Sequence, residues 1–165
     1  MIAGKQALEH TVGPRNIESN IVAHYFLGIA YNNLGQFELS IAELNQALSL
    51  IPKDRKFDLF GTTGILSVLC KIWLIRGLAQ VGHFSETLQY GEDAIQTAVE
   101  RDHPFSIVYA YYAVGAVAVI KGDFDQAIAP LERGLRVCES AEIPVQRPLI
   151  VSCLAAGLCL RRSHR

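Results

Sequence analysis

The feature that most constrains the fold of this chain is a pattern that occurs three times along it. Each copy has a glycine followed two positions later by a phenylalanine: Gly35 and Phe37, Gly82 and Phe84, Gly122 and Phe124. A small residue and then an aliphatic one come three and four positions after each phenylalanine. The glycines are 47 and 40 residues apart, which is a spacing typical of repeats that stack on their neighbours. The pattern therefore predicts a row of similar units that share one continuous core.

Each unit has the sequence features of two helices joined by a tight turn. Gly35, Gly82 and Gly122 suit the left-handed conformation that ends a first helix and turns the chain. Asp123 and Asp125 follow the last of these glycines, and we expect them to cap the next helix. The longer step contains DLFGTTGIL over residues 58–66, which predicts a loop. Four prolines fall between the predicted units: Pro52, Pro104, Pro144 and Pro148.

The repeated pattern resembles the tetratricopeptide repeat, a motif of two antiparallel helices over 34 residues. The unit at about 21–54 matches best, through Leu27-Gly28, Tyr31, Gly35, Phe37, Ser40, Leu44, Ala47 and Pro52. His24 stands where the family often has tryptophan, so we expect it to pack in the core. The unit at about 108–141 also matches well. The unit at about 68–101 is weaker, because Ile75 replaces a glycine and Gly91 replaces a large residue.

The resemblance implies an all-α fold, a right-handed superhelix of antiparallel helix pairs, in a single domain over residues 1–165. Partial repeats are expected at 1–20 and 148–165, on either side of the three full units. The first would begin inside a second helix at Lys5–His10. No polar capping helix is evident at either end. We therefore expect a piece of a longer solenoid, or ends covered by a partner or by a second copy of the chain.

Two stretches are similar to a narrower family. FGTTGILSVLCKIWLIRGLAQVGHFSE (60–86) and the run from Gly122 to Ala155 resemble the C-terminal repeat region of certain bacterial multidomain proteins. In that family a class III adenylate or guanylate cyclase domain is joined to a P-loop ATPase and then to tetratricopeptide repeats. The resemblance implies a regulatory or assembly segment of a cyclase-linked signalling protein. The alternative is the repeat module of an ATPase-type transcriptional regulator.

Composition narrows the class of protein further. Half of the 165 residues are hydrophobic, which is too apolar for an intrinsically disordered chain. Fifteen basic and 16 acidic residues give a net charge of -1, whereas a nucleic-acid binder needs a basic face.

The first ten residues lack the pattern of a secretory signal. The four cysteines form no CxxC pair, so we expect buried thiols and a cytoplasmic protein: Cys70, Cys138, Cys153 and Cys159.

The run from Pro104 to Ile120 carries no charge and is at the lower limit of length for a membrane span. It also contains three tyrosines and falls where the repeat pattern requires a buried helix. We therefore expect no membrane span, and a membrane-associated helical protein stays as the lesser alternative.

Motifs that carry chemistry are missing from the sequence. It has no phosphate-binding loop, no GxSxG, no HExxH and no calcium loop. Asp123-Phe124-Asp125 is the nearest acidic cluster, and it lacks further oxygen donors at suitable spacing. We expect no catalytic residue, metal site or cofactor, and therefore no enzyme.

A partner-binding surface remains. In the repeat family the first helix of each unit lines the binding groove, which implies a protein or peptide partner or another domain of a larger polypeptide. Tyr25 and Ile29 replace the lysine and asparagine with which some members clamp a C-terminal carboxylate, so an apolar segment is the better expectation. The polar and aromatic groove positions are the expected contacts: Tyr25, Asn32, Asn33, Arg76, Gln80, Tyr109 and Tyr112. For Tyr109 and Tyr112, packing between units is the alternative role. Self-association through the uncapped ends is a further expectation.

Overall fold

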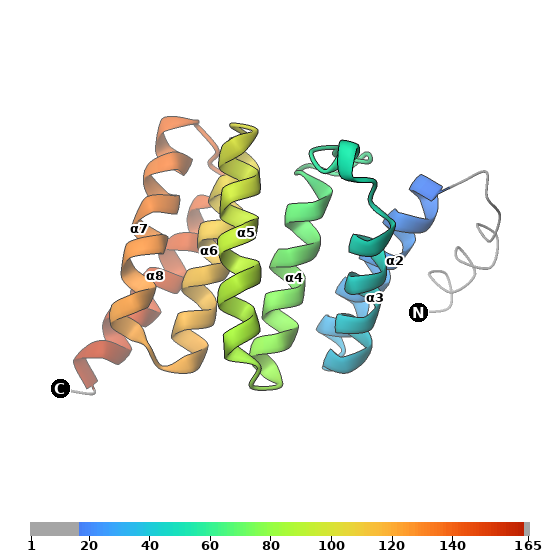
Figure 1. Cartoon of the computed structure of the whole chain (residues 1–165). Helices are drawn as coiled ribbons and strands as arrows, with labels where there is room; N and C mark the ends of the chain where they lie inside the picture. Colours follow the sequence, from blue (N-terminus) through green and yellow to red (C-terminus); the bar gives the residue numbers. More distant parts are fainter. Residues whose placement is uncertain (1–16, 164–165) are drawn as a thin grey trace.

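A computed structural model describes residues 17–163, and this part of the chain consists of seven α-helices and one short 3₁₀-helix, with no strand. The helices are arranged side by side, and α2 and α8 lie at opposite ends of the row (Figure 1). Their bounds are α2 Ile17–Asn33, α3 Phe37–Leu50, η1 Lys53–Arg55, α4 Leu66–Gln80, α5 Phe84–Glu100, α6 Pro104–Lys121, α7 Phe124–Ser140 and α8 Arg147–Ser163. The helix expected at Lys5–His10, and with it most of the partial repeat at 1–20, lies outside the described residues.

The order of helix contacts is that of an α-solenoid. Each helix from α2 to α8 packs against the next one along the chain. The first helices of successive pairs also pack together, because α2 contacts α4, α4 contacts α6 and α6 contacts α8. No pair of helices further apart in the row is in contact within the described part. The predicted all-α solenoid of antiparallel helix pairs is thereby confirmed.

The turns inside the pairs are made by the predicted glycines. Gly35, Gly82 and Gly122 have φ of 72°, 82° and 87°, which confirms the left-handed conformation expected of them. The predicted capping by Asp123 is wrong. Its backbone has ψ of 63°, outside the extended region usual for a capping residue, and its side chain makes no cap hydrogen bond. The Asp123 carboxylate lies 2.7 Å from Lys121 Nζ instead, and Asp125 lies 2.6 Å from Arg161 Nε.

The two helices of a pair approach closely where a glycine faces a leucine. A Cβ atom on Gly28 would lie 2.5 Å from Leu44 Cγ, so no larger residue fits without a shift. Gly115 and Leu131 repeat this contact in the third unit. The second unit differs, with Ile75 at the glycine position and Gly91 at the leucine position. There a Cβ atom on Gly91 would lie 2.8 Å from Val114 Cγ2, so this glycine allows close contact with α6 of the next unit.

Successive units are also joined by hydrogen bonds between residues 41 positions apart. The buried Ser106 Oγ accepts from the Ile65 amide at 2.9 Å. Gln146 Nε2 donates to the Phe105 carbonyl at 3.2 Å. These bonds join the start of α4 to the start of α6, and the start of α6 to the start of α8. These bonds fix how far α4, α6 and α8 are shifted along their axes relative to one another.

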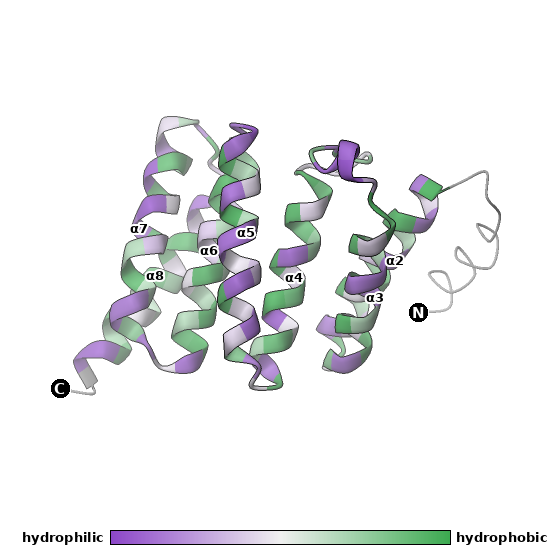
Figure 2. Ribbon diagram, in the orientation of Figure 1, coloured by the Kyte–Doolittle hydropathy of each residue, from purple (hydrophilic) through white to green (hydrophobic). Residues whose placement is uncertain are grey.

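The apolar helix α6 is an inner helix of the row. By length and composition it passes the test for a membrane span, with a mean hydropathy of 1.4 over 18 residues. In the solenoid it packs against α4, α5, α7 and α8. Its buried residues include Val108, Ala113 and Val117, which contribute to the core. In Figure 2 most of α4 and α6 is coloured hydrophobic, with hydrophilic segments also on α4, whereas hydrophilic segments recur along α5 and α7.

Two predictions for single residues need correction. His24 does not simply pack in the core, because its Nδ1 lies 2.6 Å from Glu43 Oε2 and links α2 to α3. A partly buried imidazole needs such a polar partner. The cysteines are all thiols, but only Cys70 and Cys138 are buried, whereas Cys153 is intermediate and Cys159 is exposed.

Candidate groove on the first helices

The first helices of the pairs, together with the turns that precede them, line a groove of about 310 Å³. Its lining comes from α2, α4, α6 and α8, and none of the lining side chains carries a charge: Tyr25, Ile29, Thr63, Leu69, Trp73, Phe105, Tyr109, Val145, Gln146 and Leu149. Leu69, Tyr109 and Leu149 are spaced 40 residues apart, so they stand at the same level of three successive units. The repeat spacing therefore builds the groove.

Aromatic side chains make up much of the groove wall. Phe105 and Tyr109 meet edge to face with 6.2 Å between ring centroids. Tyr109 and Tyr112 are stacked at 6.0 Å with 9° between the ring planes. Such contacts hold the rings in place on α6, and rigid aromatic rings bury a large area of a ligand at little cost in conformational entropy.

Arg76 supplies a positive charge beside this uncharged lining. Its guanidinium carbon lies 4.4 Å from the centroid of the Trp73 ring, one helical turn away on α4. No acidic side chain among residues 17–163 pairs with Arg76. Arginine stacked on an aromatic face keeps its planar set of donors for an incoming acceptor. The arrangement can therefore bind an anionic group next to an apolar surface.

The tyrosines near Arg76 are neutral hydrogen-bond donors at neutral pH. Burial raises the pKa of Tyr109 and of Tyr112, and the nearby charge of Arg76 offsets only part of this effect. Burial also raises the pKa of Tyr25, which is only 6% exposed in the floor of the groove. The groove thus offers hydroxyl groups in their uncharged form beside one cation.

The structure brings together four of the seven predicted contact residues. Tyr25 and Tyr109 line the groove, Tyr112 stacks on Tyr109, and Arg76 lies over Trp73. Tyr109 and Tyr112 are both partly buried against the core of the solenoid, which confirms the packing role, and their contact with a partner stays a prediction.

The other three predicted residues lie away from the groove lining. Asn32 is 8% exposed and sits between helices, where its Nδ2 donates to Ser40 Oγ at 3.4 Å. Asn33 and Gln80 are exposed at the C-terminal ends of α2 and α4.

The sequence analysis missed Trp73, Phe105 and Gln146 as groove residues. Trp73 is the chain's single tryptophan and stands one position past a groove position of the repeat family. Phe105 at the start of α6 and Val145 just before α8 are 40 residues apart, so the repeat spacing could have identified them. Gln146 is 5% exposed, and its Oε1 is buried with no partner among the described residues. Nothing in the sequence indicates this orientation.

The part of the chain that the structure describes contains no cluster of side chains suited to bind a metal ion. No group of three or more histidine, cysteine, aspartate or glutamate side chains there could hold a metal ion. The groove combines apolar area, aromatic faces and hydroxyl groups, with one guanidinium beside it.

Comparison with known proteins supports the fold at two levels. Residues 21–54 match the family model of the tetratricopeptide repeat. Among solved structures, the apo form of RapI superimposes with a TM-score of 0.79 at 12% identity, covering 98% of this chain and 57% of that chain. A Rap protein complexed with competence and sporulation factor gives a TM-score of 0.81 at 21% identity, with 97% and 42% covered. This chain thus spans about half the length of these solved structures. A search of curated protein sequences finds no match.

Proposed function

We propose that this chain is a protein-interaction module that binds an apolar segment of a partner in the groove on its first helices. The observation that carries the proposal is an uncharged, aromatic-lined groove with Arg76 at its edge. The partner segment would place an aliphatic or aromatic side chain in the groove and a carboxylate against the guanidinium. The carboxylate is either that of an acidic side chain or that of a chain end.

The size and chemistry of the groove suit such a ligand. A volume of about 310 Å³ is at the lower end of typical ligand pockets. Full burial of one large apolar side chain contributes about 1.5–3 kcal/mol. A carboxylate that bonds to arginine beside an apolar wall is stabilised more than in water, because the local dielectric is lower.

The solved neighbours are consistent with a binding role. One of them is described as a Rap protein complexed with competence and sporulation factor, so a repeat protein of similar fold takes a bound partner. The identity of 21% supports a shared fold, and the chemistry proposed for this chain comes from its own residues.

A peptide-display selection tests the proposal. Peptides enriched on the wild-type chain are sequenced and then measured against Arg76→Gln, Tyr109→Ala and a control, Arg133→Gln, whose side chain is exposed on α7. We expect enriched peptides to combine an aromatic or aliphatic residue with a carboxylate. Their binding should fall on the two groove variants and persist on the control. Enriched peptides that bind all four proteins equally would overturn the proposal.

The kind of larger protein to which this module belongs is proposed from the sequence alone. The stretches 60–86 and 122–155 support a regulatory segment of a cyclase-linked signalling protein in the cytoplasm. The repeat module of an ATPase-type transcriptional regulator is the second candidate. The flanking coding sequence distinguishes the two, since it would encode a cyclase domain in the first case and a DNA-binding domain in the second.

A further inference from the structure

A second and larger cleft lies between the second helices of the first two pairs. It measures about 630 Å³ and is lined by α3, the segment Ile51–Lys56, α4 and α5. On α4 it is lined by Ser67 and Lys71, whereas the groove is lined by Leu69 and Trp73. At about 100° per residue these two pairs lie on opposite faces of the helix. The cleft is therefore separate from the groove.

The long step between the first two units supplies part of the wall of this cleft. The step is 47 residues there and 40 at the next junction, and the extra length lies in the segment between α3 and α4. That segment supplies both Lys53 and Lys56 to the cleft wall. A smaller pocket of about 60 Å³ lies between α5, α6 and α7, toward the opposite end of the helices and near the turn between α6 and α7. The cleft therefore depends on a segment that has no counterpart between α5 and α6.

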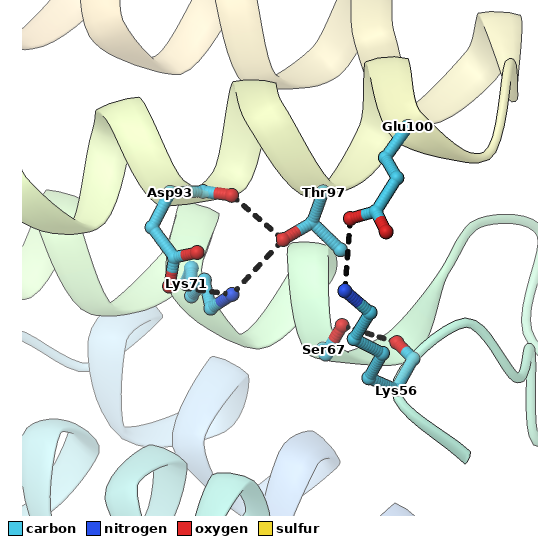
Figure 3. Close-up of polar contacts among 6 residues, drawn as sticks. All are labelled: Lys56, Ser67, Lys71, Asp93, Thr97 and Glu100. Atoms are coloured by element: carbon cyan, nitrogen blue, oxygen red, sulfur yellow. Dashed lines mark hydrogen bonds and ion pairs between the residues drawn. The ribbon is translucent and has the colours of Figure 1, made fainter. Parts of the chain in front are cut away.

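Lysines dominate the charge of the cleft. Its lining includes Lys53, Lys56 and Lys71 and only one acidic residue, Asp93. Lys71 is largely buried in the wall of the cleft, with its side chain 12% exposed. Its Nζ lies 2.8 Å from Asp93 Oδ2 and donates to Thr97 Oγ1 at 3.4 Å (Figure 3). An ammonium group has three donors, so Lys71 keeps one for a further acceptor.

The remaining lysines are accessible to a ligand. Lys56 Nζ lies 2.8 Å from Glu100 Oε2, in a pair whose side chains are 45% and 51% exposed (Figure 3). An exposed pair of this kind contributes little and exchanges readily with another carboxylate. Lys53 is exposed and has no acidic partner within residues 17–163.

The lysines lie along one edge of α5. Lys71 contacts Asp93 and Thr97, and Lys56 contacts Glu100, so the two ammonium groups follow successive turns of this helix. In an extended chain every second side chain points to the same face, so carboxylates at alternate positions can face several lysines at once. A peptide also supplies apolar side chains for the uncharged part of the lining, which a compact anion such as phosphate does not.

We infer that the cleft binds an acidic, extended peptide segment, with separate carboxylates at Lys71 and Lys56 and a third at Lys53. Leu48, Ile51 and Pro52 offer apolar surface for the side chains between the carboxylates. This site is independent of the groove on the first helices, so the failure of either proposal leaves the other standing.

Fluorescence polarisation tests the inference with a short labelled peptide that has glutamate at every second position, so that the carboxylates share one face of the extended chain. The matched peptide has glutamine at those positions. The protein variants are Lys56→Gln, the double variant Lys53→Gln and Lys56→Gln, and the control Lys121→Gln. Lys121 is 43% exposed and paired with Asp123, so it resembles Lys56 but lies at the small pocket between α5, α6 and α7, away from the cleft. Lys71 is left unchanged because its burial makes it part of the fold.

The expected result is binding of the glutamate peptide and not of the glutamine peptide. The double variant should bind about tenfold more weakly, since each exposed ion pair contributes up to about 1 kcal/mol. Lys121→Gln should bind like the wild type, and amide NMR shifts should concentrate at Ser67, Lys71 and Thr97. Equal binding of both peptides, equal losses in Lys121→Gln, or binding of inorganic phosphate without the peptide would each overturn the inference.

Discussion

The guanidinium of Arg76 lies over the Trp73 ring, with 4.4 Å from its central carbon to the ring centroid. Both residues are on α4, one turn apart, and Trp73 forms part of the groove wall. This contact positions the cation at the edge of an apolar surface without an acidic partner in the described part of the chain. It makes Arg76 the residue on which the proposed binding depends most.

Replacing Arg76 by lysine is expected to weaken peptide binding while keeping the charge. Lysine lacks the planar donor set that bonds a carboxylate at two points and stacks on an aromatic ring. Because a hydrogen bond to a charged group contributes about 1.5–3 kcal/mol, the loss should be about tenfold or more. Calorimetric titration with a display-selected peptide measures it, and circular dichroism checks the helix content. An unchanged affinity would mean that the guanidinium does not bind the carboxylate.

The closeness of Gly28 to Leu44 predicts a test of helix packing. Gly28→Ala should lower the free energy of unfolding by about 1–3 kcal/mol, because the new Cβ would overlap Leu44 Cγ. In a Leu44→Ala background the same change should cost little, since the obstructing atoms are gone. Urea unfolding of the two single variants and the double variant gives the coupling. Additive effects would show that these two residues do not meet in solution.

The hydrogen bond from Ile65 to Ser106 predicts a link between successive units. Ser106→Ala should cost about 1–3 kcal/mol, because the buried Ile65 amide would lose its partner. Ser152→Ala is the control, since Ser152 is exposed and bonds only within α8. Its effect should stay within about 0.5 kcal/mol. Thermal unfolding of both variants makes the comparison, and equal losses would contradict the proposed link.

Burial of Cys70 predicts a loss of stability at alkaline pH. Burial raises the pKa of the Cys70 thiol from 9.0 to about 12, so the folded state favours the neutral form. The unfolded chain therefore loses this proton first, and the stabilisation present below pH 9 declines as the pH rises toward 12. Tyr25 acts in the same direction, because burial raises its pKa as well. The free energy of unfolding of Cys70→Val should fall less steeply with pH, and slopes equal to the wild type would exclude this role.

The sequence predicted the features that repeat. Gly35, Gly82 and Gly122 recur at one position of each unit, and all three take the left-handed conformation. Helix faces and turns follow from such local periodicity, so the solenoid and the helices that line its groove could be anticipated. Tyr25 and Tyr109 reach the groove for the same reason.

The features that do not repeat could not be predicted in this way. The pair of His24 with Glu43 and the buried position of Asn32 depend on which side chains meet between helices. The lysine cleft depends on the path of the segment between α3 and α4, which occurs once in the described chain. Trp73 lines the groove although it stands one residue past a groove position of the repeat family, and Phe105 lines it from before the predicted unit at about 108–141.

The most direct test of the groove uses Trp73, because it is the only tryptophan in the chain and forms part of the groove wall. A display-selected peptide without tryptophan is titrated while the indole emission and its quenching by acrylamide are followed. We predict a saturable change in emission and reduced quenching, with the same dissociation constant as calorimetry gives. A peptide that binds by calorimetry while leaving both signals unchanged would contradict the account, because it would bind elsewhere on the chain.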